Sequence, residues 1–203
     1  MDLSQPDSAE QLYAEVSTRR TDPVDLLVNN AGFGLYGDFA DLPTPRLQEM
    51  ICLHVLTVTK LMRLFLPEMR ARRSGAIINV ASVAGLLPIP YMAVYGATKA
   101  FQVSLGLSIG DEVRRDGVLV QTCCPGQTLT DFHATAGRSR PAAHGSEQSA
   151  AQVVSESLAA LDRGKSLVIT GFRNRLLMRA QRLIPRALVR WATIRALKPS
   201  GVQ

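Results

Sequence analysis

The sequence predicts an α/β fold, a doubly wound and mostly parallel sheet, from two observations. Runs of apolar residues with the length of strands alternate with longer segments of helical periodicity. The strand-length runs, at 24–29, 76–81, 118–123 and 166–170, are apolar throughout rather than at every second position. Such runs are typical of parallel strands that helices cover on both faces. Ligands bind beyond the carboxyl ends of the strands in such sheets, so we expect a site where these runs end.

Four segments have the pattern of helices that pack against such a sheet, at 8–17, 44–67, 91–115 and 149–161. Thr44-Pro45 marks the start of the second, because a cap residue followed by proline is favoured in a first helical turn. The expected buried stripe of this helix consists of Leu47, Ile51, Val55, Val58, Leu61, Met62 and Phe65. The loop 137–148, rich in Gly, Ser, Arg, Pro and His, is expected to be mobile and to act as a lid.

Length and composition favour one core in a reducing compartment. A chain of 203 residues with 46% hydrophobic and 20% charged residues can bury a single sizeable core. The three cysteines form no disulfide framework, and the adjacent Cys123 and Cys124 are interpreted as core residues rather than catalytic thiols. The first residues lack the pattern of a signal peptide, and no run of about 18 apolar residues is present. We therefore expect a cytoplasmic protein.

The positive charge is concentrated near the C-terminal end. Residues 173–203 hold seven arginines, one lysine and no acidic residue, a charge of +8, whereas the whole chain carries +6. The remaining residues therefore sum to −2, and the high pI says nothing about the site. We expect two parts: residues 1–171 as the α/β domain, and residues 172–203 as a basic amphipathic helical tail that Pro185 kinks or divides.

The tail has two interpretations that the sequence leaves open. A basic amphipathic helix with a tryptophan can lie on an anionic membrane surface, which would place a peripheral contact at residues 172–198. It can equally pack its apolar stripe on the body or on a second subunit of a homo-oligomer, with the arginines in solvent. No nucleic acid is expected as a partner, because no recognised module is present and the charge is confined to the tail.

The most informative stretch begins at Ser82 and ends at Lys99. Ser82 closes the apolar run 76–81, and Tyr95 and Lys99, four residues apart, lie on one face of a helix. An ammonium group beside a phenol favours the phenolate and lowers the pKa of the phenol, and the serine hydroxyl can meet the same substrate oxygen. This spacing predicts a proton-transfer site for a carbonyl/alcohol pair, and no metal is expected in it.

The same residues resemble the motif of the short-chain dehydrogenase/reductase family, a serine followed after twelve residues by tyrosine and then, after three more, by lysine. Asn29-Asn30-Ala31-Gly32 after the first apolar run is similar to the N-N-A-G motif of that family, and Pro125-Gly126 is similar to its P-G motif. Together these motifs cover about residues 1–135. The resemblance implies a Rossmann-like fold and an NAD(P)-dependent oxidoreductase that transfers hydride between nicotinamide and a carbonyl or alcohol.

The resemblance also implies a role for each motif. Tyr95 would be the general acid in reduction and the general base in oxidation, Lys99 would lower the pKa of Tyr95 and hold the nicotinamide ribose, and Ser82 would orient the substrate carbonyl. Thr130 is a weaker candidate, with a cap of the next segment as the alternative. The cofactor is expected to be NAD(P)(H), with a slight preference for NADP. The residues expected to bind it are Asp2, Leu3, Asn30, Ala31, Gly32, Tyr95, Lys99, Pro125, Gly126 and Thr128.

Two features depart from the family pattern. No T-G-x-x-x-G-x-G turn precedes Asn29, and Asp2-Leu3 resembles the end of the third strand, so the first two βα units are expected to be missing. We favour a fragment or a misplaced start over a shortened protein, and expect such a chain to fold poorly because one sheet edge is open. His54 stands where the family has an asparagine that completes a catalytic tetrad through a bound water. Partial substitution and a purely structural histidine are both open interpretations.

The surroundings of the motifs indicate the substrate only coarsely. Residues 86–90 and Met92 would line the mouth of the site, which favours an apolar carbonyl compound or alcohol. The alternative function is that of a non-catalytic relative, acting as a scaffold, a dimerisation partner or a membrane-surface protein.

Overall fold

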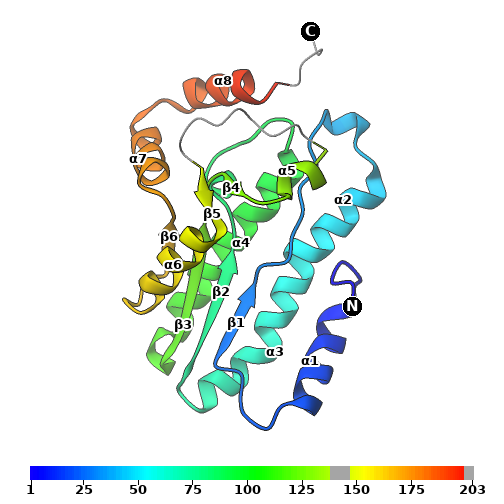
Figure 1. Ribbon diagram of the computed structural model, residues 1–203, viewed down its shortest axis with the longest axis vertical. Coiled ribbons are helices and arrows are strands. Elements are labelled where there is room, and N and C mark those ends of the chain that lie inside the picture. The colour runs from blue at the N-terminus through cyan, green and yellow to red at the C-terminus, as the bar shows by residue number, and fades with distance from the viewer. Residues whose placement is uncertain (138–146, 199–203) are drawn as a thin grey trace.

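The computed structural model, which describes residues 1–137 and 147–198, is built on a four-stranded parallel sheet (Figure 1). The strand order is β1-β2-β3-β6, and every neighbouring pair is parallel, which confirms the predicted sheet. A second, two-stranded sheet pairs β4 (Thr128–Leu129) with β5 (Gln148–Ser149). Because the four main strands are parallel, their carboxyl ends meet at one edge of the sheet. The main strands are β1 (Leu26–Asn29), β2 (Gly75–Val80), β3 (Val118–Cys124) and β6 (Leu167–Ile169).

One face of the sheet carries the main hydrophobic core. It is covered by α1 (Ser8–Arg19), α3 (Val58–Ala71) and α4 (Ala93–Val113), which are long enough to span the sheet. Burial of large apolar side chains from these helices and from β2 and β3 is the main source of stability of the fold. The core residues are Ala9, Val58, Leu61, Met62, Phe65, Met69, Ile77, Val113, Val118 and Val120.

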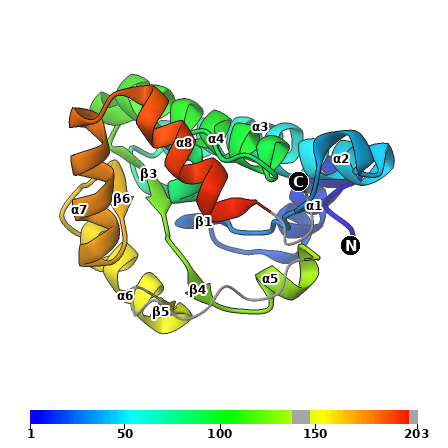
Figure 2. The same cartoon turned by 90° about the horizontal axis from the view of Figure 1, so that it is seen from above.

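The opposite face also carries a helix, as expected of a doubly wound sheet, although the described residues cover this face only in part. It is α6 (Ala150–Leu161) that packs there, through Val153 against Ile78 and Cys123 (Figure 2). Since α6 lies on the other side of the sheet from α3 and α4, the connection from β3 to β6 has the opposite hand to the two before it. On this face Leu26 and Val28 of the edge strand β1 are 39% and 48% exposed.

The predicted helix 44–67 is interrupted by a wider turn. It consists of α2 (Thr44–Ile51), a π-helical segment (Cys52–Thr57) and α3 (Val58–Ala71). The π turn adds one residue to the helical repeat and so shifts, by one position, which residues before it face the core. Met50 is therefore buried, whereas Ile51 is 45% exposed. The prediction of Ile51 as a core residue is therefore wrong. By length and hydropathy the whole segment could cross a membrane, but its apolar face here belongs to the core.

The remaining helices are short and lie toward the carboxyl edge of the sheet. They are α5 (Phe132–Thr135) and the tail helices α7 (Phe172–Ala180) and α8 (Arg186–Leu197), and Pro185 divides the tail as predicted (Figure 1). Most of the predicted lid 137–148 lies outside the described residues. Single 3-10 turns occur at Phe39–Asp41, Val83–Gly85, Arg114–Asp116 and Gln181–Leu183.

Described residues connect the tail to the body near both of its ends. Arg175 forms an ion pair with Glu156 of α6 at 2.8 Å. Asn174 lies so close to Gly126 that a Cβ added at the glycine would lie 2.3 Å from the Asn174 amide nitrogen. At the far end of α8, the Tyr36 hydroxyl donates to the carbonyl oxygen of Leu197 at 2.7 Å. Both tail helices are thereby held across the carboxyl edge of the sheet, where the strands end.

Candidate active site

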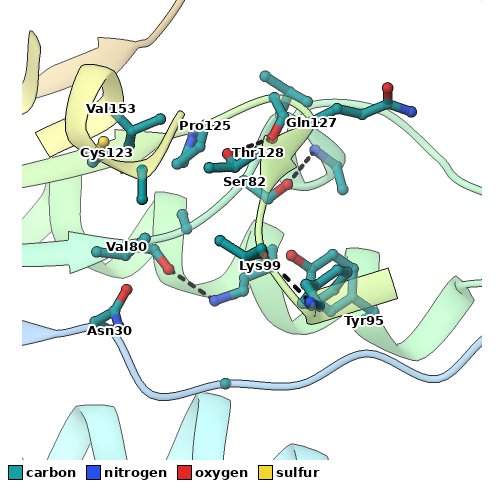
Figure 3. Close-up of a pocket in the computed structure, with 18 of the residues that line it drawn as sticks. Asn30, Val80, Ser82, Tyr95, Lys99, Cys123, Pro125, Gln127, Thr128 and Val153 are labelled. Carbon is teal, nitrogen blue, oxygen red and sulfur yellow. Dashed lines mark hydrogen bonds between the residues drawn. The ribbon is translucent and has the colours of Figure 1, made fainter. Parts of the chain in front are cut away.

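A cavity of about 970 Å³ opens at the carboxyl ends of the strands (Figure 3). The structure brings Ser82, Tyr95 and Lys99 together in its wall, from the end of β2 and from two turns of α4. These residues are separated by up to 17 positions in sequence but face one space, as their spacing predicts. Other predicted residues in the wall are Asn30, Gly32, Met92, Pro125, Gly126, Thr128 and Thr130.

Ser82 is held at the point where β2 ends and a 3-10 turn begins. Its hydroxyl oxygen accepts a hydrogen bond from the Ala84 backbone nitrogen at 3.1 Å, which makes Ser82 the cap of that turn. Ser82 and Tyr95 both line the cavity, and the Ser82 hydroxyl acts to lower the pKa of the phenol. The Ser82 hydroxyl and the Tyr95 phenol can therefore act on one substrate oxygen.

Tyr95 is almost completely buried and is held between two rings. Its ring centroid lies 5.9 Å from that of His54 and 5.2 Å from that of Phe132, and the residue is 8% exposed. Burial raises the pKa of Tyr95 to about 12, and the Ser82 hydroxyl opposes this rise only in part. The lowered pKa that the neighbouring lysine predicts is therefore not found, because desolvation of the phenolate is the largest effect on this group. The phenol of Tyr95 is therefore neutral at pH 7.

Lys99 points along the helix toward the sheet and not directly at the phenol. Its Nζ donates to the Val80 carbonyl oxygen at 2.8 Å and to Gln102 Oε1 at 3.0 Å, and lies 5.9 Å from the centroid of the Tyr95 ring (Figure 3). Burial lowers the pKa of Lys99 to about 8, because the ammonium group has left most of its water. Lys99 therefore changes charge close to neutral pH.

Gln102 is a site residue that the sequence reasoning missed. It is 1% exposed, and its amide accepts from Lys99 and donates through Nε2 to the His54 backbone carbonyl at 2.9 Å. The amide thus joins the ammonium group of α4 to the π-helical segment. Its position three residues after Lys99 on the same helical face was the available signal.

His54 is a neutral, completely buried residue beside the site. Its Nε2 accepts from the Phe33 backbone nitrogen at 3.2 Å, which leaves Nδ1 as the donor to Thr98 Oγ1 at 2.9 Å. The Thr98 hydroxyl in turn donates to the Tyr95 carbonyl oxygen at 2.8 Å. Burial, and to a smaller extent the charge of Lys99, lowers the pKa of His54 to about 3. The imidazole is therefore a hydrogen-bonding spacer between α4 and the turn after β1.

The other predicted cofactor residues divide into two groups. Asn30, Gly32, Pro125, Gly126 and Thr128 line the cavity. The Thr128 hydroxyl donates to the Gly126 carbonyl oxygen at 3.2 Å. Thr130 also caps the next segment, since its hydroxyl oxygen accepts from the Phe132 nitrogen, as the alternative interpretation held.

Asp2, Leu3 and Ala31 are not among the residues that line this cavity. Asp2 is exposed, and its carboxylate accepts from the backbone nitrogen and the hydroxyl of Ser4, which lowers its pKa. The Leu3 carbonyl oxygen accepts from the hydroxyls of Ser8 and Thr57. Their assignment to a cofactor stays a prediction from the resemblance.

Part of the wall comes from elements that no motif indicated. The inner sides of α7 and α8 contribute apolar residues opposite Tyr95, and α6 contributes the wall beside β3. The sequences of α6, α7 and α8 carry no pattern that indicates packing over the cavity, so the sequence did not predict their lining residues. They are Ala150, Val153, Val154, Ser157, Leu158, Leu177, Met178, Thr193, Ala196 and Leu197.

The two neighbouring cysteines behave as core residues, as predicted. Cys123 and Cys124 are 1% and 0% exposed, and burial raises the pKa of both thiols, that of Cys124 to about 12. Neutral thiols are poor nucleophiles. Among the described residues, no cluster of metal-ligating side chains is present either.

The family model for short chain dehydrogenases matches residues 1–141, which contain all three motifs and the whole Ser82, Tyr95 and Lys99 arrangement. The chain belongs to the short-chain dehydrogenase family. The family model matches more than half of the chain, and the three side chains line one cavity. Both observations agree with the Rossmann-like α/β sheet described above.

Several family members are similar in sequence. The uncharacterized oxidoreductase YvrD of Bacillus subtilis is 35% identical over 130 residues, 64% of this chain and 49% of the relative. The human very-long-chain 3-oxoacyl-CoA reductase is 35% identical over 123 residues, 58% of this chain and 39% of the relative. The chain thus spans about half or less of the length of these curated relatives.

Solved structures of the family superpose on nearly the whole chain. A short-chain dehydrogenase from Sphingobium yanoikuyae in complex with NADPH is 25% identical with a TM-score of 0.77, covering 100% of this chain and 75% of that one. A 7β-hydroxysteroid dehydrogenase is 25% identical with a TM-score of 0.81, covering 98% of this chain and 75% of that one.

Proposed function

We propose that the chain carries the catalytic site of an NADP(H)-dependent oxidoreductase that interconverts an apolar carbonyl compound and its alcohol. The observation that carries the proposal is the convergence of Ser82, Tyr95 and Lys99 on one cavity at the carboxyl ends of the strands. Family membership supports the reaction type, and the NADPH and NADP complexes of structural relatives support the cofactor.

The residues present fit one end of a dinucleotide. Amide, hydroxyl and ammonium donors from Asn30, Thr128 and Lys99 border the cavity and suit ribose hydroxyls and a carboxamide. Small residues Gly32 and Gly126 let the backbone come close to a ligand. When bound, the nicotinamide would supply or accept the hydride. The described residues include no Gly-rich turn that would hold a pyrophosphate.

The protein's own part is to move a proton at the substrate oxygen. With a pKa of about 12, Tyr95 holds its proton at neutral pH and can donate it to a carbonyl oxygen as that oxygen gains negative charge. Ser82 donates a second hydrogen bond to the same oxygen. The positive charge of Lys99 then stabilises the phenolate that remains. The protonated phenol is the form of Tyr95 that acts in reduction.

The cavity wall supports a bulky apolar substrate. Most of the groups around the space opposite Tyr95 are hydrocarbon, which would bury an alkyl chain or ring system. The relatives named ketoacyl reductase and 3-oxoacyl-CoA reductase support a ketoacyl substrate class. The apolar lining residues include Leu87, Ile89, Met92, Phe132, Leu177, Met178 and Leu197.

We also propose that the active enzyme is a longer protein in which further strands extend the sheet beyond β1. The support is that the chain spans about half the length of its curated relatives. The exposure of Leu26 and Val28 on the edge strand points the same way.

The test is turnover of a hydrophobic ketone with NADPH, measured for the chain alone and for the chain extended by its upstream coding sequence. Tyr95→Phe keeps the buried ring and removes the proton, so we expect a loss of about 10²- to 10⁴-fold in kcat with an unchanged circular dichroism spectrum. Equal activity of Tyr95→Phe and wild type would overturn the assignment. No turnover in either form, with NADPH still binding, would favour a non-catalytic relative.

A further inference from the structure

The tail helices α7 and α8 have two different faces. One face is turned toward the body and lines the cavity with Met178, Thr193 and Ala196. The other face points away from the body, with α8 crossing the top of the molecule and α7 running down its side (Figures 1 and 2). We call this the outer face, and its exposed apolar residues are Phe172, Leu176, Leu183, Leu188 and Trp191.

The outer face is more apolar than a soluble surface requires. These five side chains are between 57% and 89% exposed, with Leu183 the most exposed. Scattered exposed apolar residues are ordinary, but five large ones on two consecutive helices are the kind of exposed apolar surface that a partner covers. The inner face already packs on the body, so this patch is not needed for the fold.

The positive charge of the tail favours a partner with a negatively charged surface. Residues 172–198 carry seven arginines and one lysine and no acidic residue, and the body supplies Glu156 as the ion-pair partner of Arg175. The Arg195 guanidinium lies 5.6 Å from the Trp191 ring centroid, so a cation and an aromatic ring are presented together. A second copy of the chain would bring the same positive face to a symmetric contact, which like charges oppose.

We propose that the outer face of α7 and α8 binds the surface of an anionic phospholipid bilayer. The apolar side chains would enter the boundary between headgroups and acyl chains, with Trp191 at headgroup level and the arginines on the phosphates. The attachment points Glu156, Gly126 and Tyr36 hold the face in place, so the body need not rearrange. This contact does not depend on the oxidoreductase activity proposed above.

The test uses Trp191, the single tryptophan of the chain, as a reporter. The full chain is mixed with vesicles of phosphatidylcholine alone or of phosphatidylcholine with phosphatidylglycerol. With the anionic vesicles we expect flotation, a blue shift of the Trp191 emission and quenching by brominated acyl chains. We expect salt to weaken all three and neutral vesicles to give none.

Matched variants distinguish binding through the outer face from nonspecific hydrophobic adsorption to vesicles. Leu183→Ser/Leu188→Ser should abolish flotation, whereas Phe39→Ser/Ile51→Ser, which changes two exposed apolar residues on other surfaces, should leave it intact. Arg190→Gln/Arg195→Gln should weaken binding about fivefold for each arginine, and Arg19→Gln/Arg63→Gln should have no such effect.

Three results would overturn the proposal. They are no flotation with anionic vesicles, flotation that both leucine-to-serine changes leave intact, and equal binding to neutral and anionic vesicles. Sedimentation velocity tests whether a second copy of the chain binds the outer face instead. If the protein is a dimer that does not bind vesicles, and Leu183→Ser/Leu188→Ser dissociates this dimer, the outer face is a dimer interface.

Discussion

Lys99 and Gln102 are bonded side chain to side chain inside the protein, with 3.0 Å between Nζ and Oε1. Both residues are less than 5% exposed, and the other end of the same amide donates to the His54 backbone carbonyl. A buried ammonium group needs such acceptors, because desolvation disfavours its charge. The Gln102 amide therefore helps to set the pKa of Lys99. Among the described residues, Lys99 is the only cation near the site, and this pKa decides at which pH its charge is lost.

Removing the acceptor should lower the pKa of Lys99 further below about 8. Gln102→Leu leaves the Val80 carbonyl as the acceptor, so the charged form loses a hydrogen bond. We expect kcat/KM for reduction to fall about ten- to hundredfold at neutral pH, and its high-pH limb to move to lower pH. The measurement is the pH profile of kcat/KM in the active full-length protein.

Gln102→Glu is the matched control for that substitution. It keeps an oxygen toward Lys99 and adds a negative charge, so the pKa of Lys99 and the high-pH limb should rise. If the two variants move the limb in the same direction, Gln102 does not act through Lys99.

His54 makes stability depend on pH. Its pKa of about 3 in the folded state is below the ordinary 6.5, so between these values the unfolded chain binds a proton that the folded protein does not. The free energy of unfolding should therefore fall as pH decreases through this window, by about 1.4 kcal/mol per pH unit for this group. Denaturant titrations between pH 7 and 5, above the range of the carboxylates, measure the slope.

Two substitutions isolate the imidazole. His54→Asn removes the titrating group and should flatten the slope, whereas Thr98→Val removes its hydroxyl partner but leaves the ring and should retain it. A slope that survives His54→Asn would show that another group is responsible.

Gly32 has no room for a side chain. A Cβ at this position would lie 2.7 Å from His54 Nε2, and the ring is fixed by its bonds to Phe33 and Thr98. Gly32→Ala should therefore cost about 1–3 kcal/mol in the free energy of unfolding. The double variant Gly32→Ala/His54→Asn should recover part of this loss, because asparagine is smaller. Additive losses in the two variants would mean that the contact with the ring is not the cause.

Glu156 fastens α7 to the body. Its carboxylate accepts from the Gly171 nitrogen, Arg175 Nη1 and Gln148 Nε2. Burial raises the pKa of Glu156, but these bonds together outweigh burial, so the pKa is lowered. Glu156→Gln should loosen the tail, so that trypsin cleaves at the tail arginines roughly threefold faster or more. The exposed ion pair Glu15–Arg19 provides the control, since Glu15→Gln should leave the cleavage rate unchanged.

The pH dependence of this contact has a definite sign. Because the pKa of Glu156 is lowered in the folded state, its stabilisation is present above the ordinary value of 4.5 and is lost as pH falls through the folded value. Cleavage of the tail should therefore accelerate at acid pH in wild type, when assayed with a protease active there, and should change less in Glu156→Gln.

Much of the fold followed from local pattern. The apolar runs and the proline positions predicted β1, β2, β3, β6 and the division of the tail at Pro185, because strand and helix periods are properties of neighbouring residues. The π turn at Cys52–Thr57 escaped prediction, and with it the exposure of Ile51, because one extra residue in a turn leaves no mark on composition.

The sequence by itself determined the site's chemistry: the spacings of Ser82, Tyr95 and Lys99 place a hydroxyl, a phenol and an amine where strands of a parallel sheet end. Only the tertiary structure decided the charge states of these groups, since the high pKa of Tyr95 and the low ones of Lys99 and His54 arise from burial by distant elements. It also decided which side of the tail meets the cavity and which meets solvent. Desolvation and packing depend on what surrounds a residue in space, and spacing along the chain does not contain that information.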